Sequence, residues 1–284
     1  MSDSPARRER FTINMQTLVP TFLTLLVLIA AYFLARLYGL SEIIRISFVP
    51  FPVERDLGSV VVNVALIVAS TIGGGIMLTL LPRIVEEHVR RGFAVLASLL
   101  GLMLSEAFLR LPLPILNIIL FWGWASLIII SLIFVVTGIA SPAQTDLSMV
   151  LYSSVFGLFL GVNTPTRSLL FILTILLAYD PIFVKIARPH IWIGNQHQHY
   201  QAEASSSVEK RISVGIGDMI FYSALASHTV AAYDALVVFS SFALILVGST
   251  VTSILTYERK VAPGLSLPLG LGLIPVFARL ILSG

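Results

Sequence analysis

The chain alternates between long apolar runs and short polar stretches from one end to the other. Nine of these runs are long enough, or nearly so, to cross a hydrocarbon core of roughly 30 Å. Helices are the expected conformation, because a lone strand cannot satisfy its backbone groups in lipid and the runs lack the alternation of a barrel strand. The third and fifth runs are short for a straight span. The predicted segments are 16–38, 59–81, 93–109, 115–138, 147–162, 168–187, 213–230, 235–256 and 265–282.

The composition agrees with a lipid environment. Hydrophobic residues make up 57% of the 284 positions and charged residues only 12%, and the mean hydropathy is +0.94. A soluble domain carries about 25% charged residues, so this chain has too little polar surface to cover a globule in water. We therefore expect an all-α protein, a nine-transmembrane-helix bundle that forms a single multi-pass domain over residues 1–284 in the cell membrane.

The polar stretches divide this expected domain. The N-terminal residues are polar and basic, and the apolar run after them lacks a small-residue cleavage site, so we expect an uncleaved anchor. The longest internal polar stretch is rich in Gln, Ser and His, which is typical of a flexible connector. The expected divisions are a cytoplasmic tail (1–15), helices one to five (16–162), helices six and seven (168–187 and 213–230), a cytoplasmic connector between them (188–212) and helices eight and nine (235–282).

The distribution of basic residues predicts the orientation. With the N-terminus placed in the cytoplasm, twelve of the eighteen Lys and Arg residues fall on the inner side and six on the outer side. Because basic residues are enriched in cytoplasmic loops, the N-terminus is expected inside, and nine crossings then place the C-terminus outside. The net charge is only +3 and the basic residues form no continuous face, so we expect no nucleic-acid partner.

Two aspartates lie inside apolar runs. Asp180 is in the stretch LLAYDPIFVKIA and Asp218 is in VGIGDMIFYSAL. An Asp near the centre of a spanning helix costs about 2.5 to 3.5 kcal/mol, so such residues persist mainly where they face water or one another. The two segments are consecutive and antiparallel, which puts both carboxyl groups roughly 8 to 10 Å from the cytoplasmic helix ends. The sequence therefore predicts that these carboxyl groups meet at one depth.

Two carboxyl groups brought together in a poorly solvated place share a proton, because both cannot ionise at low cost. The ionised group can then take a proton from water while the protonated group polarises a carbonyl. This is the chemistry of aspartic proteases. The same two carboxyl groups are also suited to a proton or cation pathway, so a membrane transporter or channel stays open as the alternative at this stage.

The residues beside the two aspartates fit this chemistry. Gly215 and Gly217 remove side chains just before the second aspartate, so water and a substrate backbone can approach closely. Pro181 follows the first aspartate and lacks a backbone N–H, which predicts a kink and frees the carbonyl of Leu177. Tyr179 places a phenol beside the same carboxyl group.

These residues carry a resemblance to a known family. The YD pair at Tyr179–Asp180 and the GIGD stretch at Gly215–Asp218 resemble the YD and GxGD motifs of the presenilin and signal-peptide-peptidase family, whose members are nine-pass intramembrane aspartyl proteases. That family has a third motif, Pro-Ala-Leu, at the start of its last helix. This chain has LSLPLGLGL at that place, where Pro268 and Leu269 are the natural counterparts, although the triplet reads Leu-Pro-Leu.

The resemblance implies a function and a set of site residues. It implies hydrolysis of peptide bonds within transmembrane segments, with transmembrane-helix proteins as substrates, the lipid bilayer as surroundings, and no cofactor or metal. The short connector between the sixth and seventh segments resembles that of the compact archaeal homologues, and a homo-oligomer is left open. The implied site residues are Asp180 and Asp218 as catalytic groups, Tyr179, Gly215 and Gly217 as active-site support, and Pro268 and Leu269 as substrate-binding residues.

The predicted orientation refines the substrate class. An N-terminus inside matches presenilins, whereas signal peptide peptidases are inverted, and a peptide must run through the site in one direction. We therefore expect single-pass substrates with the N-terminus outside. Since a helical peptide bond is shielded by its own hydrogen bond, the substrate must open, and an exposed backbone edge near Pro268 is expected to pair with it as an added strand.

Overall fold

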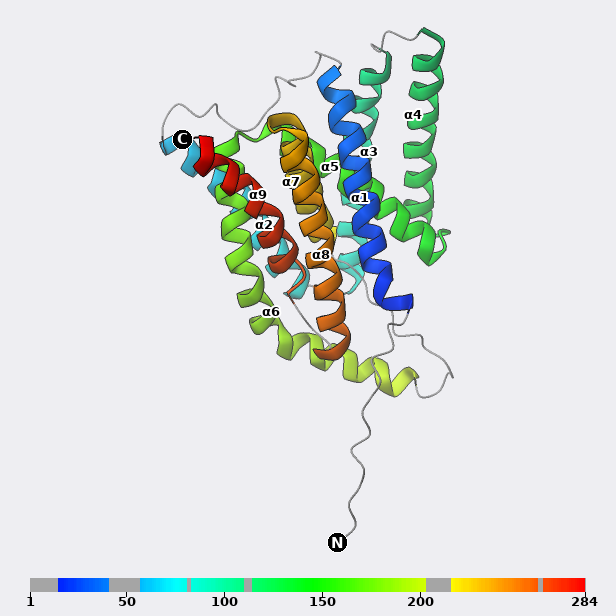
Figure 1. Ribbon diagram of the computed structural model, residues 1–284. Helices are drawn as coiled ribbons and strands as arrows, with labels where there is room; N and C mark the ends of the chain where they lie inside the picture. The colour runs from blue at the N-terminus through cyan, green and yellow to red at the C-terminus, as the bar shows by residue number, and fades with distance from the viewer. Residues whose placement is uncertain are drawn as a thin grey trace.

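The computed structural model describes residues 15–40, 57–80, 83–109, 114–202, 216–259 and 263–283, and these residues form nine helices (Figure 1). The number of helices in this part of the chain agrees with the nine apolar runs. The helices are α1 (Met15–Leu40), α2 (Leu57–Leu80), α3 (Arg83–Leu109), α4 (Pro114–Thr137), α5 (Pro142–Asn163), α6 (Thr166–Ala202), α7 (Ile216–Ala232), α8 (Ala235–Arg259) and α9 (Ser266–Ser283).

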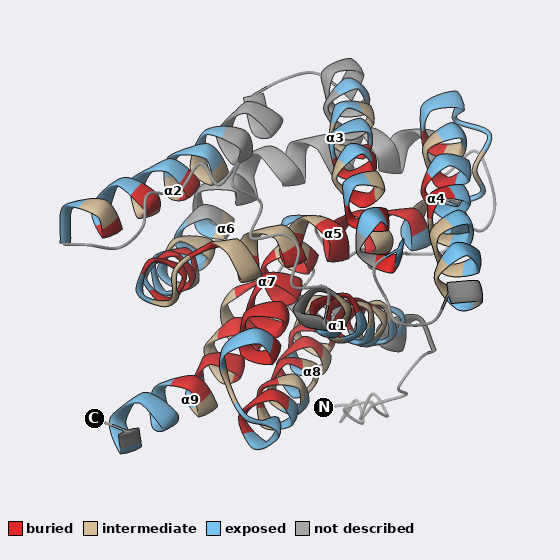
Figure 2. Ribbon diagram, turned by 90° about the horizontal axis from the view of Figure 1, so that it is seen from above, coloured by how far each residue is buried: buried red, intermediate tan, exposed pale blue. Residues whose placement is uncertain are grey.

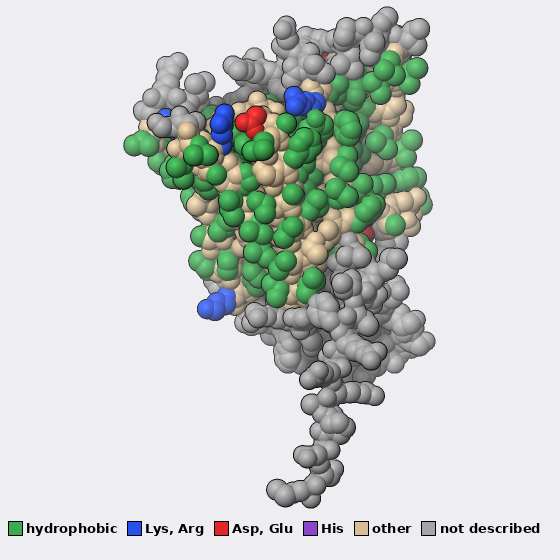
Figure 3. Space-filling view, in the orientation of Figure 1, with side chains coloured by type: hydrophobic (Ala, Val, Ile, Leu, Met, Phe, Trp, Pro, Cys, Tyr) green, Lys and Arg blue, Asp and Glu red, His purple; other side chains and the backbone are tan. Residues whose placement is uncertain are grey.

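The surface of the bundle is that of a multi-pass membrane protein. Figure 3 shows one face covered mainly by apolar side chains, with its visible charged side chains toward the two ends of the helices. By length and composition, four helices in the described ranges are suited to crossing a membrane, and two shorter ones are apolar. Nine crossings stay a prediction. The four spans are Val19–Leu37, Leu116–Thr137, Ala143–Asn163 and Ala235–Thr256, and the shorter helices are Leu57–Gly73 and Ser266–Leu282.

Several helices extend beyond the apolar runs that predicted them. The third begins at Arg83, in a charged stretch, and the fifth begins at Pro142, where Ser141 and Gln144 form a capping box. Helix α6 continues through Ala202, so the first part of the connector predicted at 188–212 is helical, and the prediction of a flexible segment is wrong there. Apolar runs mark the part of a helix that suits lipid, whereas backbone hydrogen bonds continue through polar residues until a cap or breaker intervenes.

Helix α7 is the centre of the bundle. It contacts α1, α5, α8 and α9, and every residue from Phe221 to Val230 is buried. Figure 2 shows this concentration of buried residues in α7, whereas α2 and α4 expose much of their described surface. A helix that is buried all round needs neighbours on every side. Asp218 lies in the first turn of this helix, just before the buried stretch, and is partly buried.

Helix α5 approaches α7 closely because two glycines, four residues apart, face it. A Cβ atom at Gly157 would overlap the backbone of Ile220 and the side chain of Ser223, and a Cβ atom at Gly161 would overlap the backbone carbonyl of Ala224. Small residues at this spacing let helix backbones pack directly against each other in membranes. The pair therefore fixes the distance between α5 and the helix that carries Asp218.

We expect Gly161→Ala to destabilise the fold, because the added methyl group meets the Ala224 backbone, which cannot rotate away. The free energy of unfolding should fall by about 1–3 kcal/mol. Gly123→Ala on α4 is the matched control, since a Cβ atom there has no neighbour within 4 Å. Thermal unfolding in detergent micelles measures both variants, and equal melting temperatures would contradict this account of the α5–α7 contact.

Candidate active site

The carboxylate of Asp180 caps the start of α9. The backbone N–H groups of Leu265 and Ser266 each donate to its Oδ2 atom at 2.9 Å, and the Ser266 hydroxyl donates to the same oxygen at 2.9 Å. The first amides of a helix have no partner within the helix, and Leu265, which precedes α9, has no side-chain acceptor. Asp180 therefore supplies, from α6, the cap that α9 lacks in its own sequence.

The carboxylate of Asp218 lies against the same turn, at Gly264. It is in the first turn of α7, where a negative charge is stabilised by the helix dipole. Its Oδ2 atom is so close to the α-carbon of Gly264 that a Cβ atom at this position would overlap it. Glycine is the residue that leaves room for the carboxylate in this arrangement.

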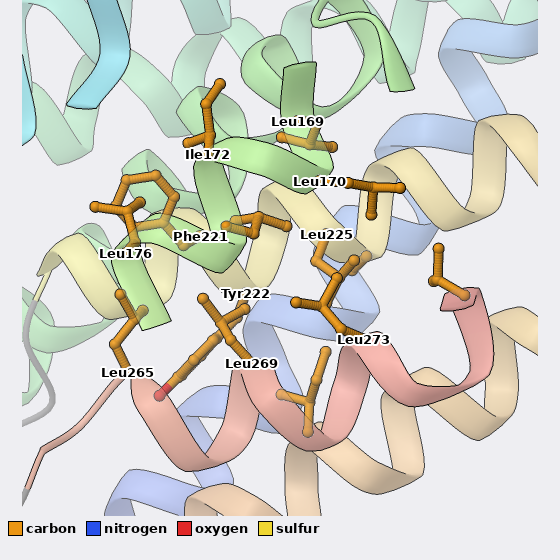
Figure 4. Close-up of a cluster of buried hydrophobic side chains, with 14 of the residues drawn as sticks. Leu169, Leu170, Ile172, Leu176, Phe221, Tyr222, Leu225, Leu265, Leu269 and Leu273 are labelled. Carbon is orange, nitrogen blue, oxygen red and sulfur yellow. The ribbon is translucent and has the colours of Figure 1, made fainter. Parts of the chain in front are cut away.

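Tyr222 connects α7 to the turn. It lies one helical turn after Asp218, is 2% exposed, and donates its hydroxyl hydrogen to the Gly264 carbonyl oxygen at 2.6 Å. Its phenol interacts electrostatically with Asp218 and also with Asp180. Figure 4 shows the Tyr222 ring reaching toward the beginning of α9, near Leu265.

Both carboxylates therefore contact one turn, Gly264–Ser266, although they come from different helices. The contacts on either side of this turn, combined with standard backbone dimensions, limit the separation of the Asp180 and Asp218 Oδ2 atoms to about 9 Å. The sequence placed these two residues at one depth by counting from helix ends near 187 and 213. That count does not match the observed ends, since α6 runs to Ala202, but the two side chains still reach the same place.

The other residues expected beside the aspartates have different surroundings. Tyr179 is partly buried and packs against the largest hydrophobic cluster. Gly217 is exposed, and a Cβ atom there would meet nothing within 4 Å, so the space next to Asp218 is open on this side. Gly215 lies outside the described residues.

Pro268 and Leu269 lie beyond the turn, inside α9. Leu269 is completely buried in the hydrophobic cluster, and the backbone of Pro268 packs against Gly248 of α8. The exposed backbone edge expected near Pro268 is wrong, because this segment is helical and its amides bond along the chain, beginning with Leu269 N–H to the Leu265 carbonyl at 3.1 Å. The substrate-binding role of these two residues stays a prediction.

Sequence reasoning missed the residues that surround the two carboxylates. Leu265 and Ser266 donate to Asp180, Gly264 lies against Asp218, and Tyr222 donates to the Gly264 carbonyl. One signal was present. Pro263-Gly264-Leu265 keeps two of the three residues of Pro-Ala-Leu and stands directly before the last helix. The apolar run predicted at 265–282 begins at Leu265 and so divides this triplet between a loop and a helix, which leaves Pro268 and Leu269 as the first Pro-Leu pair within the run.

We expect Asp180→Ala to loosen the start of α9, because three donors lose their acceptor. The free energy of unfolding should fall by about 1–2 kcal/mol, and the amides of Leu265 and Ser266 should exchange hydrogen faster. Asp180→Asn keeps a side-chain oxygen at the cap and should lose less. Hydrogen exchange followed by mass spectrometry measures this, and unchanged protection of both amides in Asp180→Ala would contradict the capping role.

Comparisons with known proteins bear on the fold and on the C-terminal part of the chain. A profile of the Presenilin family matches residues 192–283, which include Asp218 and the Gly264–Ser266 turn but not Asp180. A search of curated proteins gives no match. Among solved structures, one described as a presenilin family intramembrane aspartate protease aligns with 16% sequence identity and a TM-score of 0.58, covering 94% of this chain and 99% of the other. The resemblance to presenilins is therefore confirmed in the sequence of the C-terminal third, and the chain as a whole has the fold of a presenilin-family structure.

Proposed function

We propose that the protein is an intramembrane aspartic endopeptidase that hydrolyses peptide bonds within the transmembrane segments of membrane proteins. The observation that carries the proposal is that Asp180 and Asp218, from consecutive helices of an apolar bundle, both contact one turn, at adjacent residues. Intramembrane carboxyl groups are costly and mark function by default. The fold and the family profile support the same reading.

The chemistry follows from one proton shared between the two carboxyl groups. Water attacks the carbonyl carbon of the scissile bond and gives a proton to the ionised carboxylate, while the protonated carboxyl group gives its proton to the carbonyl oxygen. The resulting tetrahedral diol then collapses. The C–N bond breaks, the leaving nitrogen takes a proton from the newly protonated carboxyl group, and a hydroxyl proton of the diol returns to the other. The reaction needs no group beyond the two carboxyls and water.

The turn between the carboxylates organises the site in this proposal. Pro263-Gly264-Leu265 takes the place of the family's Pro-Ala-Leu motif, with Tyr222 holding its carbonyl group. Pro268 and Leu269 support the turn from behind, through α8 and the hydrophobic cluster. The open space at Gly217 is suited to the approach of an extended substrate backbone beside Asp218.

The proposed topology has nine crossings of the cell membrane, with the N-terminus in the cytoplasm and the C-terminus outside. The excess of Lys and Arg on the inner side supports it. Because a peptide must run through the site in one direction, this orientation of the enzyme selects single-pass substrates with the N-terminus outside.

We expect Asp180→Ala and Asp218→Ala each to abolish cleavage of a transmembrane-helix substrate by the purified, liposome-reconstituted protein, because each removes one half of the acid–base pair. The matched control is Asp234→Ala. Asp234 also accepts a hydrogen bond from a helix amide, Val237 N–H at 3.1 Å, but lies at the junction of α7 and α8. It should retain cleavage. Mass spectrometry of the peptide products measures the outcome. Cleavage by either of the first two variants, or ion flux without any cleavage, would overturn the proposal in favour of transport.

The orientation of the substrate has its own test. Two reporters with the same transmembrane sequence are inserted in opposite directions, and the one with its N-terminus outside should be cleaved at least about tenfold faster. The reason is that a peptide bound in reverse presents its carbonyl groups to the wrong carboxyl. Preferential cleavage of the inverted reporter would contradict the topology and leave the catalytic pair unaffected.

A further inference from the structure

The hydroxyl group of Ser266 lies between two acceptors that both belong to α6. Its Oγ atom is 2.9 Å from Asp180 Oδ2 and 3.2 Å from the carbonyl oxygen of Leu177. A serine hydroxyl has one hydrogen, so it can donate fully to only one of these oxygens at a time. The rotation of this hydroxyl group therefore determines whether the carboxylate or the backbone carbonyl accepts its hydrogen bond.

The second acceptor exists because of Pro181. In a regular helix the carbonyl of Leu177 would accept a hydrogen bond from the N–H of residue 181, but proline has none. The described contacts give this carbonyl a donor from another helix instead, the hydroxyl of Ser266. The proline next to Asp180 thus creates a vacant helical acceptor within reach of the same hydroxyl that contacts the carboxylate.

The contacts of Asp180 are one-sided. All three hydrogen bonds recorded for its carboxylate in the described part of the chain end on Oδ2, and two of them come from backbone amides that cannot turn away. An oxygen with three donors is a poor place for a proton, so protonation takes place on Oδ1. Only the hydroxyl among the three donors can respond when the charge of the carboxylate changes.

We propose that Ser266 is a positioning residue for Asp180. It fixes the carboxyl group through Oδ2 and leaves Oδ1 to exchange protons with water. Its hydroxyl alternates between Oδ2 and the Leu177 carbonyl as Asp180 loses and gains the proton of the pair. This rests on the proposed catalytic role of Asp180. A donor to an ionised carboxylate forms a stronger bond than a donor to a neutral one. The hydroxyl therefore prefers Oδ2 while Asp180 is ionised and turns to the carbonyl once Oδ1 is protonated.

Few titratable groups lie near Asp180 in the described residues, so a pH profile can be interpreted. From α7, Tyr222 interacts with it and Asp218 contacts the same turn. Tyr179 and Lys185 are close to it in the sequence of α6. The first turn of α9 contributes only uncharged donors, and α2, which also contacts α6, has no titratable side chain in its sequence.

The test compares Ser266→Ala and Ser266→Thr with the wild-type protein in liposomes, using the same helical substrate. We expect Ser266→Ala to lower kcat about tenfold with little change in KM, because the carboxyl group is held less firmly, and to move the acid limb of the kcat/KM profile to higher pH. The reason for the second effect is that the variant removes a donor that favours the ionised carboxylate over the neutral one. Ser266→Thr keeps a hydroxyl group and should restore both quantities.

Pro181→Ala provides a second variant with an effect of opposite sign. It returns an N–H donor to the Leu177 carbonyl, so the hydroxyl loses its alternative acceptor and the neutral form of Asp180 is less favoured. The acid limb should then move to lower pH. A shift of the same sign as in Ser266→Ala would overturn the proposal, and so would a wild-type profile in Ser266→Ala. This variant also keeps the proposal testable should Ser266→Ala fail to fold.

The matched control is Ser253→Ala on α8, whose buried hydroxyl donates only to the Ser249 carbonyl, at 2.8 Å. It should keep the wild-type rate and pH profile.

An infrared titration of the Asp180 carboxylate band, identified by its loss in Asp180→Asn, provides a measurement that needs no cleavage. We expect the midpoint of this band to move to higher pH in Ser266→Ala, and an unmoved midpoint overturns the inference. Absence of cleavage by the wild type overturns the proposed function. The infrared result does not depend on cleavage, so it tests the role of Ser266 separately.

Discussion

The hydrogen bonds from the start of α9 to Asp180 Oδ2 are the contact on which the arrangement of the site depends. The first amides of a helix need acceptors, and in an apolar bundle water is a poor substitute. A carboxylate on another helix meets this need and is itself stabilised by the amides and the helix dipole. The same contact therefore satisfies a structural demand of α9 and fixes the position of an acidic group that would be costly elsewhere in the bundle.

The second carboxylate depends on a missing side chain. Gly264 allows Asp218 to lie against the backbone of the turn, and an alanine in this position would force the carboxylate into another orientation. The family motif named from the sequence has alanine at the middle of its triplet, whereas this chain has glycine. The turn is thus closer to α7 than a Pro-Ala-Leu triplet would permit with this orientation of Asp218, and Tyr222 fixes it there through the Gly264 carbonyl.

The sequence predicted the helices well because lipid leaves few alternatives for an apolar run. It predicted their ends poorly wherever a polar stretch stayed helical, as at Arg83 and Ala202. The two aspartates were found because a charge inside an apolar run stands out. The freed carbonyl of Leu177 also followed from Pro181. The sequence did not predict the hydrogen-bond partner of that carbonyl, Ser266. This residue lies 89 positions away, and no local pattern indicates that a cap for α9 comes from α6.

The polar groups of the turn are already in use, and in the proposed function this constrains how a substrate would bind. A strand that paired with Leu265 and Ser266 would compete with Asp180 for their amides, and one that paired with Gly264 would compete with Tyr222 for its carbonyl. Each exchanged hydrogen bond costs about 1 kcal/mol unless the substrate replaces it. Pairing at the turn therefore releases Asp180 from its cap only where the substrate supplies acceptors for the amides of Leu265 and Ser266. In the proposed function, a substrate that stays helical keeps its carbonyls occupied and leaves these amides on Asp180, which is the arrangement that fixes the carboxyl group through Oδ2.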